Sequence, residues 1–66
     1  MSNELKLLAL IAKEIQKERA TQADFLASGR ASDHAEYRHV CGVIRGLNTT
    51  ETIINDLVQR LEKDDD

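Results

Sequence analysis

The sequence lacks proline and tryptophan and contains one cysteine, three glycines and two other aromatic residues, Phe25 and Tyr37. A single cysteine excludes a disulfide within the chain. The absence of proline removes the strongest helix breaker, and the abundant Ala, Leu, Glu, Lys, Arg and Gln favour helix. So few aromatic residues predict a thin, aliphatic core. We therefore expect residues 1–66 to form one domain, near the size below which domains often need disulfides, metals or partners.

The charge balance is mildly acidic, with 9 basic and 12 acidic residues and a net charge of −3. This balance argues against general nucleic-acid binding, although it leaves room for a local basic patch. The apolar run at 5–12 follows an acidic start and has no small-residue cleavage site, so we expect neither a signal peptide nor a membrane span. A free cysteine without an export signal predicts a reducing, cytoplasmic setting.

The first predicted helix covers about residues 3–28. Ser2 or Asn3 supplies a cap at its start, and Gly29 supplies the left-handed residue that commonly follows a helix. A stripe of Leu5, Leu8, Ala12, Ile15 and Leu26 marks its buried side. Leu7, Ile11 and Phe25 widen that stripe, whereas Arg19 and Gln22 interrupt it.

The second predicted helix covers about residues 33–63, and its first turn contains Asp33 and Glu36 at capping-box spacing. A short connection makes the two helices antiparallel neighbours, so the expected fold is an all-α two-helix hairpin. The acidic tail 64–66 is expected to be solvated. Because a lone hairpin buries little apolar area, we expect it to self-associate into a helical bundle.

A heptad repeat runs through the whole second helix and is the most regular pattern in the sequence. Its positions are Tyr37, Val40, Ile44, Leu47, Glu51, Ile54, Val58 and Leu61. Spacing of three and four residues keeps one stripe of a helix, as in a coiled coil, against one neighbour. Gly42, Gly46 and Ile53 lie roughly opposite Ile44, on a second face. A helix with two packing faces favours two neighbours, of which the hairpin supplies one.

Two features leave alternatives open along this repeat. Gly46 followed by Asn48 and Glu51 has the pattern of a helix end and a new cap, which would give a three-helix fold. We favour one continuous helix, because the heptad keeps its phase through this stretch. Glu51 occupies a core position, where it either fixes the register or extends outward to solvent.

Gly42 and Gly46 form a small-xxx-small pattern inside the predicted helix. Glycine inside a helix costs about 1 kcal/mol relative to alanine, and close approach of another backbone would offset that cost. We expect a tight helix crossing here, either within the hairpin or between chains. The competing interpretations are a helix break and a tolerated weak point.

Few residues have the spacing that chemistry requires. Glu36 and His39 form one Glu-x-x-His, as in di-iron bundles, and Glu14 or Glu18 is the conceivable bridging ligand. A solvated polar surface explains this common spacing better. Cys41 is expected to be a small buried hydrophobe rather than a nucleophile. We therefore predict no catalytic, metal or cofactor site and no enzymatic activity.

Basic side chains gather around the connection and the start of the second helix. Arg30, Arg38 and Arg45 are the candidate contacts for an anionic partner, with His34 and His39 nearby. Arg38 and Arg45 are seven residues apart and so share one side of the helix. Chain length and architecture resemble the Rop-like helical hairpin that modulates plasmid RNA pairing, which keeps RNA binding as an alternative. The other interpretation is an exposed rim that pairs with acidic residues.

The segment Tyr-Arg-x-x-Cys-Gly-x-Ile-x-Gly-Leu, residues 37–47, resembles a pattern in very small proteins of tailed bacteriophages that are encoded near head and portal genes. The resemblance covers 36–58 at most and involves no catalytic residue. It implies a helical, virion-associated or assembly protein made in the bacterial host cytoplasm. The expected function is structural or adaptor work through helix contacts with itself or a larger virion protein. The alternatives are an inhibitor of a host protein and the RNA-binding hairpin.

Overall fold

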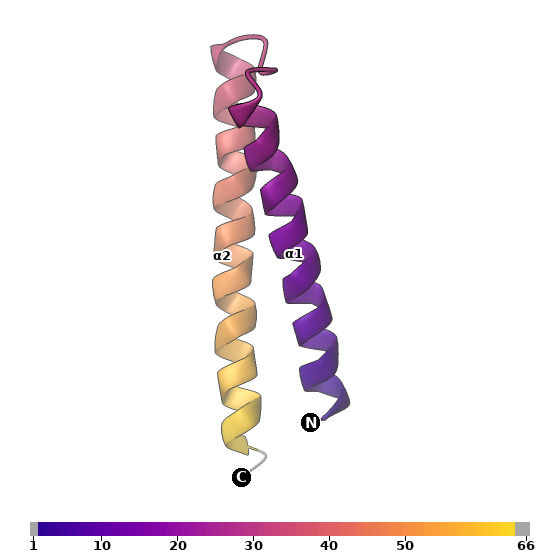
Figure 1. Cartoon of the computed structure of the whole chain (residues 1–66). Coiled ribbons are helices and arrows are strands. Elements are labelled where there is room, and N and C mark those ends of the chain that lie inside the picture. The colour runs from indigo at the N-terminus through magenta and orange to yellow at the C-terminus, as the bar shows by residue number, and fades with distance from the viewer. Residues whose placement is uncertain (1, 65–66) are drawn as a thin grey trace.

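A computed structural model describes residues 2–64 and shows two long antiparallel helices (Figure 1). Helix α1 spans Asn3–Ala27 and helix α2 spans His34–Asp64. The predicted all-α hairpin is confirmed, and the helix ends differ from the expected ones by a single residue. Asp64 ends α2, whereas Asp65 and Asp66 of the predicted acidic tail lie outside the described residues.

Local capping explains where α1 begins and ends. The Ser2 hydroxyl accepts a hydrogen bond of 3.1 Å from the backbone N–H of Leu5, satisfying one of the free donors of the first turn. At the other end, Gly29 has a positive φ of 74° and its N–H donates to the Leu26 carbonyl. The predicted glycine stop is therefore confirmed.

The start of α2 uses the expected residues in a slightly shifted arrangement. The Asp33 carboxylate accepts a hydrogen bond of 2.8 Å from the N–H of Glu36, as a capping box requires. The Glu36 carboxylate reaches back to the N–H and hydroxyl of Ser32, one residue before the position expected in the standard motif. These Ser32 contacts, with a smaller contribution from the charge of His39, lower the pKa of Glu36.

Helix α2 runs without interruption through Gly46 and Asn48, so the three-helix alternative is wrong. Hydroxyls in this stretch donate back to carbonyls four residues earlier: Thr49 to Arg45, Thr50 to Gly46 and Thr52 to Asn48. Each threonine thereby satisfies its polar group inside the helix instead of capping a new one.

The seam between the helices follows the main predicted stripes, but it is thin. Leu7 and Ile11, which were expected to widen the α1 stripe, are instead exposed. Among residues 2–64 only Leu5, Val40 and Ile54 are buried, with exposed fractions of 6–8%. The remaining seam residues are half-buried. Tyr37 departs from the expected packing, because it is 49% exposed and its ring stacks on His34 with centroids 6.4 Å apart. A heptad drifts by about 20° per repeat on a straight helix, which moves this first position to the edge of the stripe.

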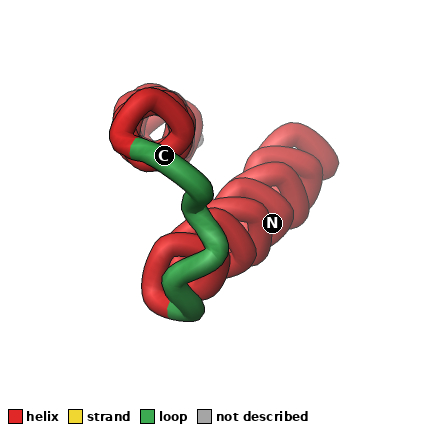
Figure 2. Tube along the Cα trace, turned by 90° about the horizontal axis from the view of Figure 1, so that it is seen from above, coloured by secondary structure: helices red, strands yellow, loops and turns green. Residues whose placement is uncertain are grey.

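The molecule is a rod rather than a globule. It measures 50 × 14 × 12 Å, and its Cα radius of gyration is 15.2 Å. A compact chain of this length would have a radius of about 11 Å. Seen from above, the two helices and their connection make a single layer, and no third element of residues 2–64 covers either side (Figure 2). Neither α1 nor α2 is apolar over a stretch sufficient to cross a membrane.

Candidate interaction surface

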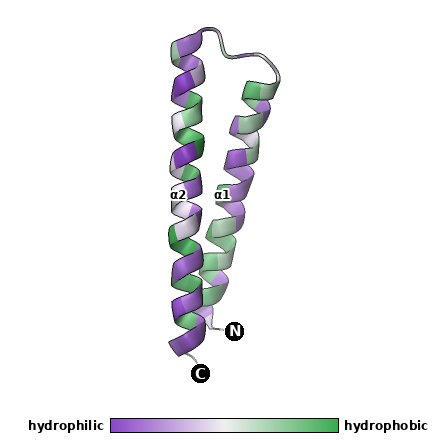
Figure 3. Ribbon diagram, turned by 90° about the vertical axis from the view of Figure 1, so that its left-hand side faces the viewer, coloured by the Kyte–Doolittle hydropathy of each residue, from purple (hydrophilic) through white to green (hydrophobic). Residues whose placement is uncertain are grey.

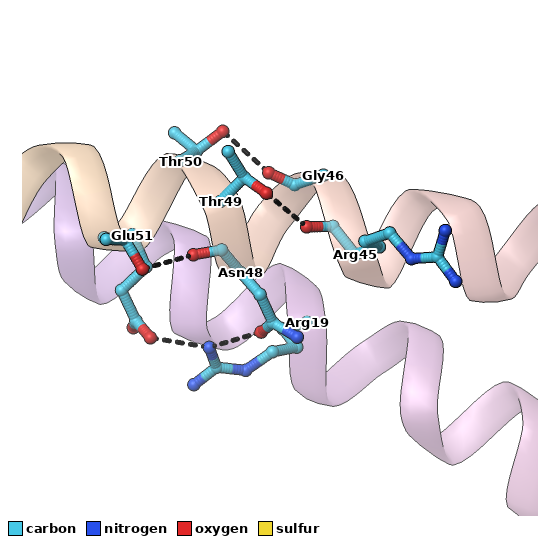
Figure 4. A network of polar contacts seen from close by, with 8 residues as sticks. Arg19, Arg45, Gly46, Asn48, Thr49, Thr50 and Glu51 are labelled. Carbon is cyan, nitrogen blue, oxygen red and sulfur yellow. Dashed lines mark hydrogen bonds and ion pairs between the residues drawn. The ribbon is translucent and has the colours of Figure 1, made fainter.

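A polar layer crosses the middle of the seam (Figure 4). Arg19 of α1 donates from Nη1 to Glu51 Oε1 at 2.7 Å and to Asn48 Oδ1 at 3.0 Å. This is the one ion pair within residues 2–64, and its side chains are 31% and 19% exposed. Arg19 and Glu51, the charged residues within the apolar stripes of the two helices, therefore pair with each other. The contact ties one level of α1 to one level of α2.

Glu51 is held in its charged form. The hydrogen bond from Arg19, with a smaller contribution from Gln16, lowers the pKa of its carboxyl group. Its second oxygen, Oε2, is buried without a hydrogen-bond partner in the hairpin. Of the two interpretations left open for Glu51, the one in which it sets the register agrees with the ion pair.

The two sides of the seam differ in chemistry. On one side, Asn48 bonds to Arg19 and Gln16 lies near Glu51. On the other side, Leu47 and the α1 residues Leu10, Ile11, Glu14, Ile15 and Glu18 line an open groove. Leu57 follows Asn48 by nine residues, which is about 180° around the helix, so it lies on the groove side.

Five large hydrophobic side chains are exposed on the groove side, and together they form what we term the apolar face. They are Leu7, Leu10 and Ile11 of α1 and Ile53 and Leu57 of α2, with exposed fractions of 40–62%. On each helix, a residue one position before a buried one lies about 100° to one side of the buried stripe. In an antiparallel pair, this flank lies on the same side of the hairpin for both helices. Leu7, Ile11, Ile53 and Leu57 therefore share one surface of the hairpin. Leu10 lies farther around α1 and joins this surface at the groove that it lines.

The apolar face lies toward the end of the rod that holds the first turns of α1 and the last turns of α2. The first part of α1 is coloured mostly hydrophobic and its middle mostly hydrophilic (Figure 3). Glu14 and Glu18 border the groove at that boundary. A central apolar area with a charged border is the usual anatomy of a protein–protein interface.

Neither Gly42 nor Gly46 is crowded within the hairpin. A Cβ atom added at either glycine would have no neighbouring atom within 4 Å. The expected close crossing within the hairpin is therefore wrong, because both glycines lie on the surface of α2 that faces away from α1. A crossing between chains stays a prediction.

The predicted anionic contacts lie in two parts of the hairpin, the connection and α2. Arg30, in the connection, places its guanidinium 5.4 Å from the centre of the Phe25 ring and donates to the Ser28 hydroxyl. Arg38 and Arg45 are exposed on α2. Cys41 is only half-buried, as a residue at the seam edge. Within residues 2–64 no three His, Cys, Asp or Glu side chains gather in a metal-binding arrangement.

The predicted packing residues divide into two groups, apart from Tyr37, which is exposed at the start of the seam stripe. Val40, Ile44, Leu47, Ile54, Val58 and Leu61 are buried or half-buried in the seam. Gly42, Gly46 and Ile53 are exposed on the second face. Sequence reasoning missed the exposed Leu10 and Leu57 and the Arg19–Glu51 pair. A helical wheel of each helix would have placed both leucines outside the buried stripe.

The chain matches no protein-family model, and no curated protein or solved structure is significantly similar to it.

Proposed function

We propose that this chain is a non-enzymatic assembly or adaptor protein that acts through helix contacts. The observation that carries the proposal is a 50 Å rod in which only three of the described side chains are buried. Such a thin seam provides little of the apolar burial that must balance chain entropy. Packing against other helices would supply the missing burial.

The excess of exposed surface has the size of an interface. The hairpin exposes 5138 Å², whereas a compact monomer of its 7.4 kDa mass exposes about 4,200 Å². The difference is close to the roughly 800 Å² that each partner buries in a standard protein interface. This agreement supports a protein that works in an assembled state.

The proposed setting is a tailed bacteriophage, with the protein made in the host cytoplasm and acting on or within the particle. The support for this step is the resemblance of residues 37–47 to small proteins encoded near head and portal genes. The partner is a second copy of the chain, a larger virion protein, or both.

Fractionation of infected cells tests the proposal. We expect the protein to co-purify with particles or head intermediates at a fixed copy number after a density gradient. Recovery with a host protein alone would instead identify an inhibitor. A salt-sensitive RNA shift that is lost in an Arg38→Gln, Arg45→Gln variant would identify an RNA-binding hairpin. Either result would replace the assembly role.

A further inference from the structure

We propose that a second copy of this chain covers the apolar face and that the two hairpins form a two-fold symmetric four-helix bundle. The inference rests on the proposed function, because it names the surface and the partner through which the protein first associates. The apolar face is the one defined above by Leu7, Leu10, Ile11, Ile53 and Leu57.

The distribution of apolar residues on α2 fits a bundle. Beside the seam stripe, a second stripe with the same spacing runs through Val43, Gly46, Thr50, Ile53 and Leu57. It is displaced by one residue from the first, or about 100° around the helix. A helix in a four-helix bundle contacts two neighbours and needs this wider apolar sector. Within the hairpin, α1 packs against the first stripe only.

The surface is also suited to pairing with itself. Both helices contribute apolar side chains to one side of a single layer, so a copy rotated by 180° presents the same apolar surface in return. A face-to-face pair would place each helix beside two others and would cover the groove along Leu10, Ile11 and Leu47. The opposite side carries the Arg19–Asn48 contact and stays in water.

The amount of exposed surface favours one partner copy. The excess over a compact monomer is about 900 Å² for each chain, which one standard interface accounts for. The rod has one such face, and its other side is polar. One two-fold interface therefore completes the assembly, with an expected mass of twice 7.4 kDa.

Paired charge substitutions at one level of α2 test the surface. Ile53→Asp with Leu57→Asp adds two acids to the apolar face, and Asn55→Asp with Gln59→Asp adds two acids at the same level on the other side. We expect sedimentation equilibrium to give a dimer for the wild-type protein and the control. The first variant should weaken association by at least about a hundredfold, because it places unpaired charges in the interface. Equal weakening by both variants would overturn the proposal.

Thiol protection gives a second measurement in which the fold is kept. In a Cys41→Ser background, Leu57→Cys and Gln59→Cys introduce single thiols on the two sides of α2. We expect alkylation of the thiol at 57 to be at least about tenfold slower than at 59 when the protein is concentrated, and the difference to shrink on dilution. Equal rates at every concentration would refute coverage by a second copy.

The measured mass separates this inference from the proposed function. A folded 7.4 kDa monomer that still co-purifies with particles would overturn the second-copy inference and leave the assembly role standing. A trimer or larger ring would also overturn it. A dimer that is absent from particles would uphold the interface and remove the proposed role.

Discussion

Ile53 and Ile54 are adjacent and chemically identical, yet their surroundings in the hairpin are opposite. Ile54 is 6% exposed in the seam, whereas Ile53 is 54% exposed on the apolar face. One residue step turns the side chain by about 100°, from the stripe that α1 covers to the stripe that nothing covers. Helix α2 thus has two apolar stripes of similar spacing, and the hairpin uses one. The unused stripe is where we expect the protein to act.

The largest expected difference comes from a charge placed at each isoleucine. Ile54→Asp buries a carboxylate in the apolar seam between the helices, where Ile54 is 6% exposed. We expect it to abolish the helical circular-dichroism signal at every protein concentration. Ile53→Asp leaves the seam intact, so its helical signal should be recovered on concentration from about 5 to 500 µM. If the helical signals of both variants responded to concentration in the same way, the stripe of Ile54 and the stripe of Ile53 would not differ in burial as they do in the hairpin.

The polar layer offers a smaller contrast within the seam. We expect Glu51→Leu alone to destabilise the protein, because it leaves the half-buried Arg19 without its carboxylate partner. The heptad alone predicts the reverse, since leucine is the better core residue. Replacing both, as Arg19→Leu with Glu51→Leu, should recover the lost stability or exceed it.

Urea unfolding of both single variants and the double variant forms a thermodynamic cycle for this pair. If the pair sets the register of the hairpin, the oligomer mass of the double variant should also differ from that of the wild-type protein. Strictly additive losses would show that Arg19 and Glu51 do not act as a pair.

Glycine replacement sharpens the comparison on the outer surface of α2. Gly42→Ala should stabilise the hairpin by about 1 kcal/mol, because it raises helix propensity and meets open space within the hairpin. The midpoint of thermal unfolding measures this gain, with Ala20→Gly, at an exposed position inside α1, as the matched change in the opposite direction. A loss of stability in Gly42→Ala would reveal a neighbouring backbone from another chain at that position.

Much of the hairpin could be predicted from the sequence because its signals are local. Ser2, Gly29 and Asp33 mark helix boundaries through short-range hydrogen bonds, and the heptad fixes which side of α2 is buried. Features that depend on how the two helices pair cannot be predicted from such local signals. The Arg19–Glu51 contact requires the register between residues 32 positions apart. The apolar face requires knowing that the outer flanks of both helices lie on one side.

The smallest expected effect is the pH dependence of the polar layer. Because the folded-state pKa of Glu51 lies below its ordinary value of 4.5, the ion pair stabilises the fold above that value. That contribution should fade as the pH falls through the lowered folded-state pKa and the carboxylate becomes protonated. Glu36 shifts in the same direction through Ser32 and adds to the slope. Thermal midpoints between about pH 3 and pH 6 should therefore fall less steeply in Glu51→Gln than in the wild-type protein, and less steeply in Glu36→Gln. Comparing the two flattened profiles separates the register contact in the seam from the cap at the start of α2. An unchanged slope in Glu51→Gln would mean that Arg19 does not hold this carboxylate in solution, and that the register is set by the aliphatic side chains alone.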